Sequence, residues 1–112
     1  MKPSNRPDHR ALAEALRRRV LEGPGETAPA LRQASAARAA GGPAAQAPYD
    51  HLACLIGEAA HRVTDAQVAA VLSATGSEKA TFEIIAAAAL GAGLLRFEQA
   101  MKVLDEVTDA PA

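Results

Sequence analysis

The residues best suited to chemistry lie together in one short stretch, Cys54-Leu-Ile-Gly-Glu-Ala-Ala-His61, which holds the only cysteine of the chain. On an α-helix, positions i, i+4 and i+7 share one face, so Cys54, Glu58 and His61 are expected to point the same way. An imidazole can accept the proton of a thiol, and a carboxylate can orient the imidazole. The stretch therefore predicts a catalytic site made of Cys54, His61 and Glu58.

Each of these three side chains also has an ordinary structural interpretation. Cys54 has apolar neighbours, and a buried free cysteine commonly acts as a small hydrophobic residue. The helix dipole would favour His61 as a capping residue near a helix C-terminus. Glu58 could pair with Arg62 four residues further on. The sequence leaves both sets of interpretations open.

Metal chemistry is not expected, although His51, Cys54, Glu58 and His61 are all potential ligands. Ligands spaced along a single helix at i, i+3, i+7 and i+10 cannot all converge on one ion. A nucleotide cofactor is not expected either. The glycine-containing stretch at 91–93 follows a helix and lacks the Lys-Ser/Thr pair of a phosphate-binding loop.

Glu83 is a more surprising carboxylate, because its neighbours Phe82, Ile84 and Ile85 form a run that looks buried. It is either a residue of a site or subunit contact, or it lies on a solvent-exposed side of its helix. These two interpretations differ in whether the carboxylate has a specific partner.

The elements that would position these residues all read as helices, and no segment has the pattern of a strand, which predicts an all-α protein. Asp8 and Thr27 are expected to cap the first two helices, and Thr64 with Gln67 forms a capping box. The pair Gly91 and Gly93 predicts either a kink or a close approach of two helices. The first predicted helix begins after Asp8 and ends before Gly23. The others cover residues 30–40, 49–62, 65–75, 78–90 and 94–107.

The chain is expected to divide near its middle. Residues 1–47 are predicted to form an N-terminal helical arm and linker, and residues 48–108 a helical core. The linker at 41–48, Gly-Gly-Pro-Ala-Ala-Gln-Ala-Pro, has no periodicity. Its flexibility could let the N-terminal part reach a neighbouring subunit.

Composition favours an assembly of several copies. The chain has 112 residues, enough for one small domain, and 49% of them are hydrophobic, but aromatic residues make up only 3%. Alanine dominates the hydrophobic set, and each alanine buries little area, so a monomer would have a thin core. We therefore expect a homo-oligomer in which alanine-rich helix faces pack between subunits.

Charge and hydropathy limit the kinds of partner and the cell compartment that we expect for this chain. With 12 basic and 13 acidic residues the net charge is −1, so no overall field attracts nucleic acid. The basic run at 17–19 is flanked by Glu14 and Glu22 and predicts a solvated helix face. The apolar run at 84–95 is shorter than the roughly 20 residues of a spanning helix, so no membrane is expected. A single cysteine fits a reducing compartment, and we expect a cytoplasmic protein.

Two stretches of the second half carry a family pattern. The first, at 77–93, reads Ser-Glu-Lys-Ala-Thr-Phe-Glu-Ile-Ile-Ala-Ala-Ala-Ala-Leu-Gly-Ala-Gly, with an amphipathic segment after it. The second, at 63–72, reads Val-Thr-Asp-Ala-Gln-Val-Ala-Ala-Val-Leu. Together they resemble the carboxymuconolactone decarboxylase and alkylhydroperoxidase D-like superfamily over residues 49–107. The resemblance implies a small helical domain of that type, assembled as an oligomer.

The redox branch of that superfamily uses Cys-x-x-Cys-x-x-x-His on a helix. Cys54 and His61 fall where the first cysteine and the histidine belong, but the second cysteine position is Gly57. The resemblance therefore implies that a dithiol cycle is impossible here. What remains is a one-cysteine enzyme that reduces a small peroxide with an external thiol, or a decarboxylase-type enzyme with a lactone-type substrate. The alternative is a non-enzymatic helical scaffold or interaction module that retains the fold.

Overall fold

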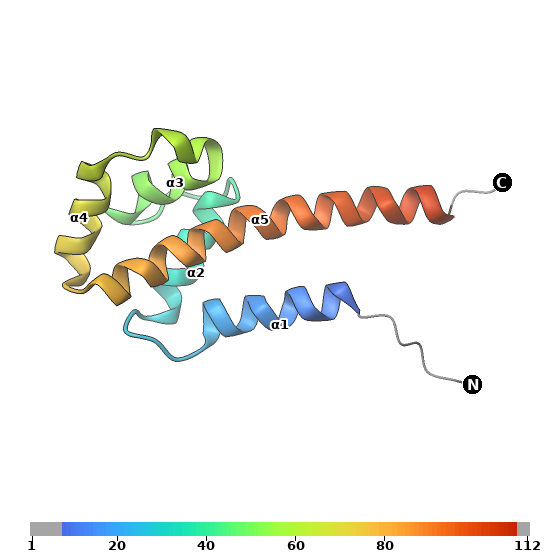
Figure 1. Cartoon of the computed structure of the whole chain (residues 1–112), viewed down its shortest axis with the longest axis horizontal. Helices are drawn as coiled ribbons and strands as arrows, with labels where there is room; N and C mark the ends of the chain where they lie inside the picture. Colours follow the sequence, from blue (N-terminus) through green and yellow to red (C-terminus); the bar gives the residue numbers. More distant parts are fainter. Residues whose placement is uncertain (1–7, 110–112) are drawn as a thin grey trace.

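The computed structural model describes residues 8–109, and within that range the chain forms five α-helices and one short 3-10 turn, with no strand (Figure 1). The all-α prediction is therefore confirmed. The elements are α1 (His9–Glu22), α2 (Pro29–Ala39), α3 (Tyr49–Ala59), the 3-10 turn η1 (Ala60–Arg62), α4 (Asp65–Thr75) and α5 (Glu78–Asp109).

Most helix boundaries follow the local signals of the sequence. The Asp8 side chain accepts a hydrogen bond from the Ala11 N–H at 3.0 Å, and the capping box of Thr64 and Gln67 is complete. Gly76 ends α4 with a φ of 81°, a left-handed conformation that suits glycine. The prediction for α2 was wrong by one residue: its N-cap is Ala28, because the Thr27 hydroxyl hydrogen-bonds to another part of the fold.

Helix α2 lies at the centre of the packing and contacts α1, α3 and α5. Apart from Arg32, its buried side chains are small (Ser35, Ala36 and Ala39), so its backbone lies close to the helices around it. The buried clusters combine Leu21, Ala36 and Ala87, then Ala39, Ala53, Ala88 and Ala92, and finally Tyr49, Leu52, Val71 and Ile84. Alanine thus supplies much of the core, as the composition indicated.

Two glycines permit the closest of these contacts. A Cβ atom built on Gly57 of α3 would overlap the carbonyl oxygen of Ala39, and one built on Gly91 of α5 would overlap that of Ala36. Helix α5 runs unbroken through Gly91 and Gly93 for 32 residues. Of the two interpretations of this glycine pair, close approach is therefore correct at Gly91, and the predicted break between two helices is wrong.

The segment between α2 and α3 is tied to both helices. Asp50 of α3 accepts a hydrogen bond from the Ala45 N–H at 2.8 Å, and its Oδ1 lies 2.8 Å from Nε of Arg38. The division into residues 1–47 and 48–108 stays a prediction, and residues 1–7 of the predicted arm lie outside the described part of the chain.

Helix α5 gives the molecule its elongated shape, 55 × 27 × 21 Å. Its C-terminal half projects beyond α3 and α4, with α1 running antiparallel beside it and an ion pair between Arg10 and Asp105 joining them (Figure 1). By length and composition α5 could cross a membrane, with a mean hydropathy of 1.5 over its most apolar 18 residues. A single helix of this kind is weak evidence for a membrane span, and 39% of that stretch is buried inside the protein.

Candidate functional site

The predicted catalytic residues occupy two different elements. Cys54 and Glu58 lie one turn apart on α3, but α3 ends at Ala59 and His61 belongs to the turn η1. The backbone changes direction at Ala59, where φ is −160° and ψ is 69°. The prediction of one helix over 49–62 was therefore wrong at its C-terminal end, and the i, i+7 relation does not place His61 on the face that carries Cys54.

The surroundings of these side chains do not form a closed site. Cys54 is half-buried, whereas Glu58 and His61 are exposed. None of the five ion pairs among residues 8–109 includes Glu58 or His61, so the predicted pair of Glu58 with Arg62 is not formed. The three side chains remain candidates by sequence, and none of them lines any of the four main hollows of the described residues.

Gly57, at the position of the missing second cysteine, has a packing role. It is buried, and any side chain there would collide with the backbone of α2 at Ala39. Its carbonyl oxygen accepts a hydrogen bond from the Arg96 side chain of α5 at 2.8 Å. A cation at the end of α3 also complements the helix dipole. The centre of the Cys54–His61 stretch is thus occupied by contacts that hold three helices together.

The described residues, 8–109, contain no group of three or more His, Cys, Asp or Glu side chains that could hold a metal ion. His51, one of the four potential ligands, lies beside α4, with its ring nitrogens 3.5 Å from the amide nitrogen of Gln67. These positions offer a metal no shared centre.

Glu83 has specific partners within the chain. Its carboxylate accepts hydrogen bonds from the backbone N–H groups of Glu26 and Thr27, both at 2.9 Å, and from the Thr27 hydroxyl at 2.6 Å. The Thr27 hydroxyl, helped by the two backbone donors and by Lys79, lowers the pKa of Glu83 to about 2. Glu83 therefore fastens the loop between α1 and α2 onto α5.

Sequence reasoning missed Arg32, which is 3% exposed. Its guanidinium donates to the carbonyl oxygens of Val20 and Gly23, both at 2.5 Å, and so caps the C-terminal end of α1. In the sequence Arg32 is one polar residue of an alanine-rich helix, and nothing marks it as buried. Together with Glu83 it fixes the α1–α2 connection from both sides.

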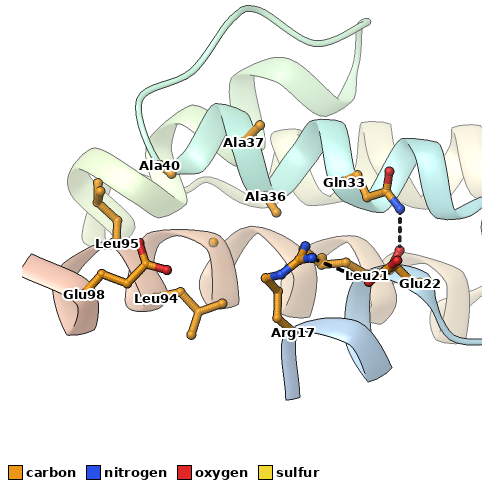
Figure 2. A pocket seen from close by; sticks show the side chains of 11 residues that line it. Arg17, Leu21, Glu22, Gln33, Ala36, Ala37, Ala40, Leu94, Leu95 and Glu98 are labelled. Atoms are coloured by element: carbon orange, nitrogen blue, oxygen red, sulfur yellow. Dashed lines mark hydrogen bonds and ion pairs between the residues drawn. The ribbon is translucent and has the colours of Figure 1, made fainter. Parts of the chain in front are cut away.

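A groove of about 460 Å³ lies between α1, α2 and α5, and Figure 2 shows it. Its floor is apolar, and three of the four polar side chains that line it, Arg17, Glu22 and Gln33, have partners within the chain. Gln33 donates to the carbonyl oxygen of Leu21 at 3.1 Å, and Arg17 pairs with Glu14 at 3.1 Å and Glu22 at 3.6 Å. Glu98 is the one polar side chain of this lining without a hydrogen bond or ion pair among the described residues, so no set of free polar groups converges on a ligand there, and Cys54 does not line the groove. These ion pairs also agree with the interpretation of the basic run as a solvated helix face.

No protein-family profile, curated protein or solved structure matches this chain. The assignment of a function therefore depends on the residues and geometry described above.

Proposed function

We propose that this chain is a non-enzymatic helical interaction module of the alkylhydroperoxidase D-like type, which acts in the cytoplasm as a homo-oligomer. One observation carries the proposal. Seven large hydrophobic side chains of α1 and α5 stay exposed, while the core is built largely of alanine. They are Leu12, Leu16, Phe82, Leu95, Val103, Leu104 and Val107. Phe82, Leu104 and Val107 share one face of α5, and exposed apolar side chains gathered on one face mark a binding surface on a soluble protein.

The competing function, reduction of peroxide by Cys54, has less support. It needs His61 to take the thiol proton, and His61 is exposed on a separate turn. It also lacks a second thiol, because the position that would hold one is Gly57. The module proposal needs neither group, and it assigns Gly57 to helix packing, where the structure places it.

The oxidation of Cys54 by hydrogen peroxide, followed by mass spectrometry, tests between the two functions. We expect the oxidation rate of an ordinary free thiol, and the same rate in His61→Ala. Glu58→Ala is the matched control, an exposed residue of the same segment whose loss should also change nothing. Rapid sulfenate formation that collapses in His61→Ala would overturn the proposal and establish a one-cysteine redox site.

A further inference from the structure

One side of α5 faces away from the core along the whole helix. We call this side the outer face. Because an α-helix has 3.6 residues per turn, its positions recur every three or four residues, with one interval of seven between Gly93 and Ala100. They lie opposite the buried stripe that includes Ile84, Ala88 and Ala92. The outer face consists of Phe82, Ala86, Ala89, Gly93, Ala100, Leu104 and Val107, and Leu12 and Leu16 of α1 are also exposed beside it.

The outer face is apolar and open. Phe82 is 66% exposed, Leu104 50% and Val107 69%. A Cβ atom built on Gly93 would have no atom within 4 Å. None of the seven α5 residues of this face is charged. Large side chains lie at its two ends, and small ones lie between them.

Five of these seven positions are symmetric about Gly93, whereas the counterparts of Ala89 and Val107 are Phe97 and Lys79. If a second α5 lies antiparallel on the first with the two Gly93 residues opposed, Phe82 of one copy meets Leu104 of the other. Ala86 then meets Ala100, and the small residues let the two backbones approach closely. Both ends of the contact are equivalent, as a two-fold interface requires. The antiparallel direction also sets the two helix dipoles favourably against each other.

A hollow beside Phe82 fits the partner's side chain. A groove of about 290 Å³ lies between α1 and α5; Leu16, Val20, Phe82 and Ala86 belong to its apolar part, and Arg19, Arg32, Lys79 and Glu83 also line it. In the antiparallel arrangement this groove receives Leu104 of the second copy. A two-fold axis provides the same contact twice.

The available area is close to what a stable dimer needs. From Phe82 to Val107 the outer face of α5 is about 38 Å long and about 10 Å wide, and α1 adds about 21 Å of a second helix. The projected area is thus about 600 Å², which lies at the lower end of the range for a stable protein–protein interface, about 600–1,000 Å² per partner.

We propose that a second copy of this chain covers the outer face, with α5 packed antiparallel on α5 about Gly93. This inference rests on the proposed function and specifies its partner and its geometry.

Disulfide cross-linking tests the register. In a Cys54→Ser background, single cysteines are introduced as Gly93→Cys, Ala86→Cys and Ala100→Cys, with the exposed Gln99→Cys of α5 as control. A disulfide needs Cα atoms within about 7 Å. We expect Gly93→Cys to link to itself, and Ala86→Cys to link to Ala100→Cys only when the two proteins are mixed. Gln99→Cys should give no covalent dimer. Circular dichroism checks that each variant is folded.

Other patterns overturn the inference in distinguishable ways. Ala86→Cys linking to itself would mean that the helices pair in parallel. An oligomer in light scattering without any of the expected links would place the interface elsewhere and leave the proposed function standing. A chain that is monomeric and binds neutral lipid vesicles through this face would overturn both the pairing and the homo-oligomeric module.

Discussion

The two sides of α5 use similar residues for opposite purposes. On the inner side, Gly91 lies against the backbone of α2, and Ala87, Ala88 and Ala92 are buried. On the outer side, a Cβ atom built on Gly93 would meet no atom within 4 Å, Ala89 and Ala100 are exposed, and Ala86 is half-buried. Gly91 thus permits a close contact within the chain, whereas Gly93, two residues further on, lies on a face that no other part of the chain covers. A small residue on a helix permits close packing, but the fold decides whether a neighbour is present.

The largest effects are expected on the inner side. Gly91→Ala and Gly57→Ala should each lower the free energy of unfolding by about 2 kcal/mol or more, because the added methyl group collides with a carbonyl oxygen of α2. At a protein concentration low enough to keep the chain monomeric, Gly93→Ala should stay within about 1 kcal/mol of the wild type, since its methyl group meets no atom of its own chain. Urea denaturation followed by circular dichroism measures all three.

Gly57→Cys sharpens the same comparison, because it restores the Cys-x-x-Cys pattern of the redox branch. We expect it to destabilise the fold about as much as Gly57→Ala. A stable Gly57→Cys protein with an intact fold would contradict the close contact between α2 and α3.

A smaller effect is expected at the loop that Glu83 fastens. Glu83→Gln should cost about 1–2 kcal/mol at pH 7, because a neutral amide replaces a carboxylate that accepts three hydrogen bonds. The pKa of Glu83 is lowered from 4.5 to about 2, so the folded state favours the ionised form. Its stabilisation is therefore complete above pH 4.5 and is lost as the pH falls toward 2.

The difference in unfolding free energy between wild type and Glu83→Gln should accordingly shrink as the pH is lowered through this window. Glu58→Gln is the control, because Glu58 is exposed and takes part in no ion pair among the described residues. A difference that stays constant between pH 5 and pH 2.5 would show that the Glu83 carboxylate is not held in its ionised form.

Local signals were enough to predict most of the fold. The caps at Asp8 and Thr64 depend on residues within one turn, so the sequence contains the whole interaction. The end of α3 was missed because no glycine or proline marks Ala59. The sequence did not predict that α5 continues unbroken. Gly91 looked like a helix break, because the sequence does not show that the α2 backbone occupies the space beside it.

The candidate site was less predictable, because its interpretation depends on partners distant in sequence. Glu83 looked anomalous in the sequence, but its donors lie 56 and 57 residues away. The spacing of Cys54 and His61 suggested one helical face only while the helix was assumed to continue. Arg32 gave no signal at all, since its acceptors are carbonyl oxygens at the end of another helix.

The molar mass in solution tests the central claim most directly. Light scattering of the wild-type chain at about 100 µM should give twice the chain mass of 11.5 kDa. The variant Phe82→Ser/Leu104→Ser should give the chain mass itself with unchanged helical content, since both side chains are exposed in the single chain. A monomeric wild type, or a double variant that still dimerises, would contradict the account of the outer face.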